Sequence, residues 1–121
     1  MEIKKYTEKT FEAIKHIDED GMEFWLAREL MLVLEYKEWR KFEGVIIKAM
    51  DAYNGSNYAI SDHFVGADKM ISIAKGAKRK IQDYKLSRYA CYLIAQNADS
   101  RKKVIALAQT YFCNSNKKGK K

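Results

Sequence analysis

The chain has 121 residues and a mass of 14.1 kDa, which is enough for one domain with a modest hydrophobic core. Apolar residues make up 47% of the chain and charged residues 32%, a balance that excludes a disordered or a membrane-embedded protein. Two cysteines cannot form a disulfide framework, and the N-terminus lacks the continuous apolar segment of a signal peptide. We therefore expect a cytoplasmic protein with no membrane partner.

Basic and acidic residues are unevenly distributed along the chain. Residues 1–60 carry nine Lys/Arg and twelve Asp/Glu, a balance of −3, whereas residues 61–121 carry fourteen and four, a balance of +10. This segregation predicts a polyanionic partner for the second half, most often nucleic acid. The alternative is that the excess positive charge only keeps a small protein soluble.

The first half of the chain has the pattern of a hairpin followed by two helices. The Asp20-Gly21 pair predicts a tight turn between short strands over residues 16–25, because glycine adopts positive φ without steric cost. Apolar residues then recur at helical spacing over residues 26–34 and again over residues 39–53. A break near residues 36–37 makes these two stretches a helix-turn-helix-like pair.

The middle of the second half predicts another hairpin. Residues 69–73 and 81–86 have partly alternating apolar patterns and are expected to pair as strands. The segment between them, residues 75–80, is strongly basic. We therefore expect a hairpin with a cationic loop at its tip.

Helical patterns return after this hairpin and complete the expected fold. Ser87 is a good N-cap for one helix, and a second helix begins near residue 99. The predicted fold class is α+β: a helix-rich single domain with a helix-turn-helix-like pair and one or two small β-hairpins. We expect the ordered domain to span residues 1–113 and residues 114–121 to form a disordered basic tail.

Three basic clusters are candidate DNA contacts. The cationic hairpin is well suited to follow a phosphate backbone or to enter a groove. The start of the last helix combines basic side chains with free backbone N–H groups, and the start of the second helix of the pair is where a recognition helix presents base-reading residues. The candidate residues are Lys75, Lys78, Arg79, Lys80, Lys85 and Arg88 in the hairpin cluster, Arg101, Lys102 and Lys103 in the last helix, and Arg40 and Lys41 in the helix pair.

The sequence offers little for catalysis. The two histidines and the two cysteines lack the short paired spacing of zinc ligands, and no phosphate-binding glycine loop or nucleophile elbow is present. We therefore expect no enzyme activity, no metal and no cofactor. Most aromatic residues lie on the apolar helix stripes, so Tyr36 and Tyr84 are the candidates for base stacking.

Several stretches resemble a known family. They include FWLAREL at residues 24–30, AKR at 77–79 and, most specifically, LSRYACYLIAQN at 86–97. These resemble the N-terminal domain of the DNA damage-inducible protein D family of bacteria, which is similar to the Bro-N domain of viral and phage proteins. The resemblance covers residues 11–113. It implies an α+β DNA-binding module of the SOS response, linked to the RecA recombinase.

Two expectations about function follow. Family members usually continue into a second, mainly helical region, so we expect a truncated form, a short relative or a mobile-element version. We predict a module that binds single- or double-stranded DNA, largely through phosphates. The alternative is a protein-interaction module that inhibits a recombinase, a repressor or a host defence factor, for which acidic residues such as Asp18, Glu19 and Asp20 would matter more. Homodimer formation stays open.

Overall fold

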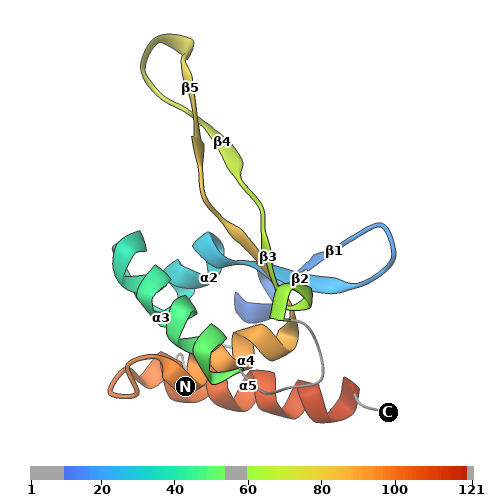
Figure 1. Ribbon diagram of the computed structural model, residues 1–121. Helices are drawn as coiled ribbons and strands as arrows, with labels where there is room; N and C mark the ends of the chain where they lie inside the picture. The colour runs from blue at the N-terminus through green and yellow to red at the C-terminus, as the bar shows by residue number, and fades with distance from the viewer. Residues whose placement is uncertain (1–9, 54–59, 120–121) are drawn as a thin grey trace.

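The computed structural model describes residues 10–53 and 60–119, with side chains as far as Cys113. A four-stranded antiparallel sheet lies above a layer of helices, and a two-stranded hairpin projects away from both (Figure 1). The sheet has the order β1-β2-β6-β3. Its strands are β1 (His16–Ile17), β2 (Glu23–Leu26), β6 (Tyr84–Leu86) and β3 (Phe64–Gly66), and the hairpin consists of β4 (Lys69–Ser72) and β5 (Lys78–Ile81).

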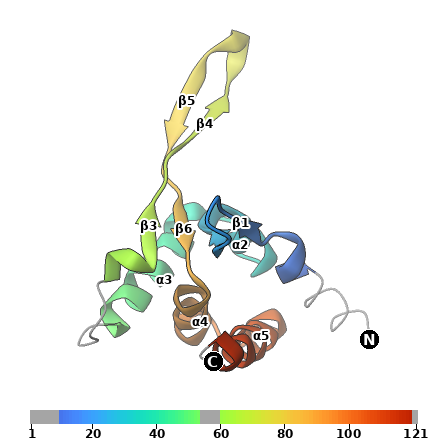
Figure 2. The same cartoon turned by 90° about the vertical axis from the view of Figure 1, so that its right-hand side faces the viewer.

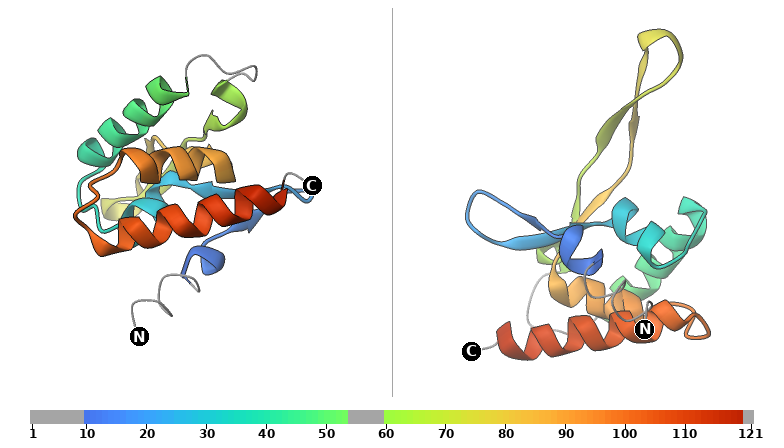
Figure 3. Two further views of the ribbon diagram at one scale, coloured as in Figure 1. Left: turned by 90° about the horizontal axis from the view of Figure 1, so that it is seen from below. Right: turned by 180° about the vertical axis from the view of Figure 1, so that it is seen from behind.

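The helical layer lies on one side of the sheet. Helix α4 lies between α3 and α5 when the molecule is seen from below (Figure 3), and it packs against both. Besides a helical turn at residues 10–13, the layer contains α2 (Ala27–Val33), α3 (Trp39–Ala52), α4 (Arg88–Asn97) and α5 (Lys103–Gly119), with short 3-10 turns η1 (Ile60–Asp62) and η2 (Ala74–Gly76). The predicted α+β class and the first hairpin, β1 with β2, are confirmed.

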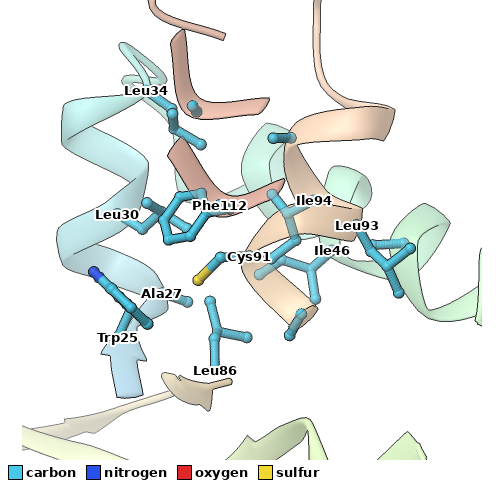
Figure 4. Packing of buried hydrophobic residues seen from close by; sticks show 14 of the residues in the cluster. Trp25, Ala27, Leu30, Leu34, Ile46, Leu86, Cys91, Leu93, Ile94 and Phe112 are labelled. Atoms are coloured by element: carbon cyan, nitrogen blue, oxygen red, sulfur yellow. The ribbon is translucent and has the colours of Figure 1, made fainter. Parts of the chain in front are cut away.

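The core fills the space between the sheet and the helices. Trp25 of β2 and Phe112 of α5 are completely buried, and their rings meet edge to face with centroids 5.1 Å apart. Around them lie aliphatic side chains from α2 and α4, including Leu30 and Ile94 (Figure 4). This apolar contact joins residues from both halves of the chain, so it fixes the position of every element that touches it.

Both predicted helices of the pair form, and the first of them has an identifiable C-terminal cap. Helix α2 ends in a Schellman motif, in which the N–H of Glu35 bonds to Leu32 and the N–H of Tyr36 bonds to Met31. Glu35 adopts the left-handed conformation there, with φ of 67°. Further along, Ser87 caps α4 as predicted, because its Oγ accepts the N–H of Ala90 at 3.0 Å.

The second predicted hairpin forms in a different register. Residues 69–73 were expected to pair with 81–86, but β4 pairs with β5 instead, and β6 joins the main sheet between β2 and β3. The physical reason is the turn: Lys75 and Gly76 both have positive φ, at 56° and 78°, so the chain reverses within residues 74–77. The cations at 78–80 therefore lie on a strand and not in a loop.

This hairpin, residues 68–81, is called the arm below. It continues the line of β3 and β6 away from the sheet, on the side opposite α4 and α5 (Figure 2). Asp83 anchors its base: the side chain is 1% exposed, and its Oδ1 accepts the N–H groups of Arg28 at 2.9 Å and Tyr84 at 2.8 Å. Because the side chain of Leu26 makes no cap hydrogen bond, Asp83 caps α2 from the connection between β5 and β6.

Helix α5 is the last element of the described residues. Helix α5 continues through residues 114–119, because no proline or glycine interrupts the chain before Gly119; Lys120 and Lys121 lie outside the described residues. Within residues 10–53 and 60–119, none of the helices combines the length and the hydropathy needed to cross a bilayer.

Candidate nucleic-acid interface

The arm carries a dense group of exposed cations. Its 14 residues include Lys69, Lys75, Lys78, Arg79 and Lys80, all exposed, and a single carboxylate, Asp68. The Asp68 carboxylate lies 4.0 Å from Lys80 Nζ, and both side chains are more than half exposed. An ion pair of this kind is weak and easily screened by salt, so it leaves the arm strongly positive.

The strand register divides these cations between two faces of the arm. Ser72 is opposite Lys78 and Met70 is opposite Lys80, whereas Ile71 is opposite Arg79 and Lys69 is opposite Ile81. Directly opposed residues share a face, and successive residues alternate between faces. The lysine face therefore consists of Met70, Ser72, Lys78 and Lys80; the isoleucine face consists of Lys69, Ile71, Arg79, Ile81 and, by alternation, Ile73.

A basic and aromatic group surrounds the base of the arm. The guanidinium of Arg28 lies 4.1 Å from the ring centroid of Trp39, and its Nε donates to the carbonyl of Gln82 at 2.6 Å. The ring of Tyr84 stacks on Trp39 with centroids 6.3 Å apart. Because Arg40 and Lys41 follow Trp39 on the first turn of α3, where both are exposed, this predicted cluster lies beside the base of the arm.

Both tyrosines proposed for base stacking are already engaged within the fold. Tyr84 is half-buried against Trp39, and burial, with the nearby charge of Glu43, raises the pKa of its hydroxyl. The hydroxyl of Tyr36 accepts the N–H of Asp99 at 3.0 Å. Their rings therefore support the fold and are not free stacking platforms.

Arg88 is a correction to the predicted cluster, because it belongs to the interior. Its side chain is 13% exposed and makes two hydrogen bonds to the Glu23 carboxylate, at 2.6 and 2.7 Å. The guanidinium also lies 4.9 Å from the ring centroid of Trp25 and 5.3 Å from that of Tyr111. Burial alone lowers the pKa of Arg88, but the bonds and charge of Glu23 outweigh it and raise the pKa. Arg88 is thus withdrawn from the candidate interface.

Lys85 lies on the main sheet and not on the arm. It is exposed on β6, opposite Val65 of β3 and Leu26 of β2, and its Nζ is 5.0 Å from the ring centroid of Phe24. Lys85 is therefore accessible to a bound partner only if that partner extends from the arm to the main sheet.

The cluster at residues 101–103 lies far from the arm and is partly used by the fold. Helix α5 begins at Lys103, so Arg101 and Lys102 precede the helix and do not form its first turn. Arg101 donates two side-chain hydrogen bonds to the Asp99 carboxylate, which lower the pKa of Asp99, and Lys102 donates to the carbonyl of Glu35 at 3.0 Å. This loop lies at the opposite end of the molecule from the arm (Figure 1). The cations at residues 101–103 therefore do not share a surface with those of the arm.

Sequence comparison now gives the family. The profile described as "BRO family, N-terminal domain" matches residues 13–112. The chain belongs to this family. It is 48% identical over 102 residues to DNA damage-inducible protein D of Escherichia coli (strain K12), an alignment that covers 84% of this chain and 37% of that protein. This BRO-family domain therefore spans little more than a third of that relative's length. No solved structure matches the chain.

Sequence reasoning missed three features of the candidate interface of this BRO-family domain. Lys69 and the exposed Ile73 were assigned only to a strand, and Arg28 was assigned only to a helix. The available signal was the isoleucine at every second position, 71 and 73, with another at 81. Once the register is known, this spacing predicts that the three share one face of the hairpin. Within the described part of the chain, no group of three or more His, Cys, Asp or Glu residues is placed to hold a metal ion.

Proposed function

We propose that this BRO-family domain binds DNA without catalysis, mainly through backbone phosphates, and that the arm makes the principal contact. The observation that carries the proposal is the arm itself: five exposed cations and one carboxylate within 14 residues that project from the body. Neutralising phosphates with such cations releases counterions, which drives binding at moderate salt. The name of the 48% identical relative refers to DNA damage and supports the same class of partner.

A second contact region completes the proposed interface. Arg40 and Lys41 lie beside the base of the arm, next to Arg28 and Trp39. A duplex held by the arm also approaches this part of α3. We assign these residues a supporting role, because α3 also carries Glu43 and Asp51 and its net charge is small.

The test compares two triple variants that remove equal charge. Lys78→Ala/Arg79→Ala/Lys80→Ala removes the cations of β5, and Arg101→Ala/Lys102→Ala/Lys103→Ala removes three cations from the opposite end of the molecule. Binding to random duplex and single-stranded DNA is measured by fluorescence anisotropy at several salt concentrations. Each lost phosphate contact lowers the slope of log K against log salt by about 0.9 on duplex DNA. We expect the first variant to lower the slope by about 2 to 3 and the second to leave it nearly unchanged.

Two results would contradict the proposal. If both variants weaken binding equally, net charge and not the arm determines affinity. If the parent protein binds neither DNA form at low salt, the domain is not a DNA-binding module.

The competing function, a protein-interaction module, is favoured by one feature. The loop between β1 and β2 presents Glu19 and Asp20 to solvent, whereas Asp18 shapes the turn by accepting the N–H groups of Asp20 and Met22. Salt-insensitive binding to a protein, with no DNA binding, would support this function. The recombinase partner, the homodimer and the cytoplasmic location remain predictions.

A further inference from the structure

We propose that the arm enters the major groove of duplex DNA with its isoleucine face toward the base edges and its lysine face toward the groove rim. Arg79 then reads bases, whereas Lys78 and Lys80 bind phosphates. This inference rests on the proposed function and assigns different roles to three neighbouring cations.

The first argument is the shape of the ribbon. A major groove about 12 Å wide admits a two-stranded β-ribbon, whereas a minor groove about 6 Å wide does not unless it is widened. The arm is a two-stranded ribbon with no buried residue, so nothing in the body blocks either face. Single-stranded DNA offers no groove, so the inference also commits to duplex DNA.

The second argument is the difference between the two faces. In a groove, base edges form the floor and phosphates line the rim, so a flat ribbon meets different chemistry on each side. The lysine face carries Lys78 and Lys80, whose flexible ammonium groups suit phosphates as point charges. The isoleucine face carries three isoleucines around Arg79, and Ile73 is 47% exposed. Apolar side chains contact thymine methyl groups, which only the major groove presents.

The third argument is the environment of Arg79. Arg79 is exposed, lies directly opposite Ile71, and makes no ion pair with any residue in the described ranges. A guanidinium in this position is free to make a bidentate contact to guanine O6 and N7. If the isoleucine face instead packed against the same face of a second molecule, Arg79 and Lys69 of the two copies would lie close together, and like charges repel.

The experiment separates the two faces with matched substitutions. Arg79→Thr removes the proposed base-reading residue, and Lys78→Thr/Lys80→Thr removes the proposed phosphate contacts; threonine preserves strand propensity. Each protein selects sites from a random duplex pool, and binding to selected and random duplexes is then measured against salt. Methyl green, a major-groove ligand, and netropsin, a minor-groove ligand, serve as competitors.

The expected results differ between the variants. The parent should enrich a guanine-containing site and be displaced by methyl green but not by netropsin. Arg79→Thr should lose discrimination at that guanine by about 5- to 150-fold and keep the parent's salt slope. Lys78→Thr/Lys80→Thr should keep the selected site and lower the salt slope by about 2.

Several outcomes would overturn the inference while leaving phosphate binding intact. These are a parent without base preference, displacement by netropsin alone, equal affinity for single-stranded DNA, or an Arg79→Thr variant that loses salt slope but not base preference. A parent that binds no DNA at all overturns the proposed function as well, so the two failures are distinguishable.

Discussion

The helical body and the arm obtain their structure in opposite ways. In the body, completely buried side chains such as Trp25 and Phe112 join the sheet to the helices. The arm has four cross-strand residue pairs and no buried residue. An isolated two-stranded hairpin is only marginally stable in water. The exposed lysines and Ile73 of the arm therefore contribute little to folding, so their placement points to binding.

The strongest test of this comparison is the removal of a core ring. Phe112→Ala should lower the free energy of unfolding by about 3–5 kcal/mol, because it leaves a cavity against Trp25 and Phe11. Lys78→Ala/Arg79→Ala/Lys80→Ala should change it far less, by about 0.5 kcal/mol per site at most. Urea unfolding followed by circular dichroism measures both. A triple variant as unstable as Phe112→Ala would mean that the arm belongs to the core.

The next test compares two cations that are three residues apart. Arg88→Ala leaves the Glu23 carboxylate without its guanidinium partner, and we expect a loss of about 2–4 kcal/mol. Lys85→Ala removes an exposed side chain and should change stability by about 0.5 kcal/mol or less. Thermal unfolding separates the two variants. The prediction for Arg88 is wrong if Arg88→Ala has the same free energy of unfolding as the parent and instead shows a smaller salt dependence of DNA binding.

A third test addresses the junction between body and arm. Asp83→Ala removes the acceptor for the N–H groups of Arg28 and Tyr84, which should cost about 1–3 kcal/mol. Asp83→Asn keeps one carbonyl oxygen for these bonds and should lose less. Denaturant unfolding compares the two. Equal losses would indicate that the negative charge, and not the hydrogen-bond acceptor, is what the junction requires.

Local patterns predicted the body better than the arm, for physical reasons. The helical spacing of Leu30 and Phe42 and the cap at Ser87 depend on neighbours in the sequence, and the corresponding helices formed. The register of the arm depends on the left-handed turn at Lys75, and lysine is not a residue that favours such a turn.

The candidate site shows the same limit. Charge counting identified the cations of β5, but it could not distinguish Arg79 from Arg88. Whether each arginine is exposed or paired depends on contacts between distant segments, since Glu23 lies 65 residues before Arg88. A pairing of this kind cannot be recognised until the fold brings β2 beside α4.

The smallest expected effect comes from two left-handed residues, one in each region. Glu35 ends α2 with φ of 67°, and Lys75 turns the arm with φ of 56°. A non-glycine residue in the left-handed conformation destabilises the fold by about 1–2 kcal/mol. Glycine avoids this strain, but its greater freedom in the unfolded chain cancels about 0.5–1 kcal/mol of the gain. Glu35→Gly should therefore raise the global free energy of unfolding by about 0.5–1 kcal/mol.

Lys75→Gly relieves the same strain in the arm, where it should act locally. Hydrogen exchange should show slower exchange of the amides of β4 and β5 in this variant, while the global free energy of unfolding changes less than it does for Glu35→Gly. The parent's arm amides should already exchange faster than those of α4, because the arm opens without exposing the core. If Lys75→Gly and Glu35→Gly stabilise the protein equally and slow exchange everywhere, the arm and the body unfold as one unit, and the separation on which the proposed binding role depends is lost.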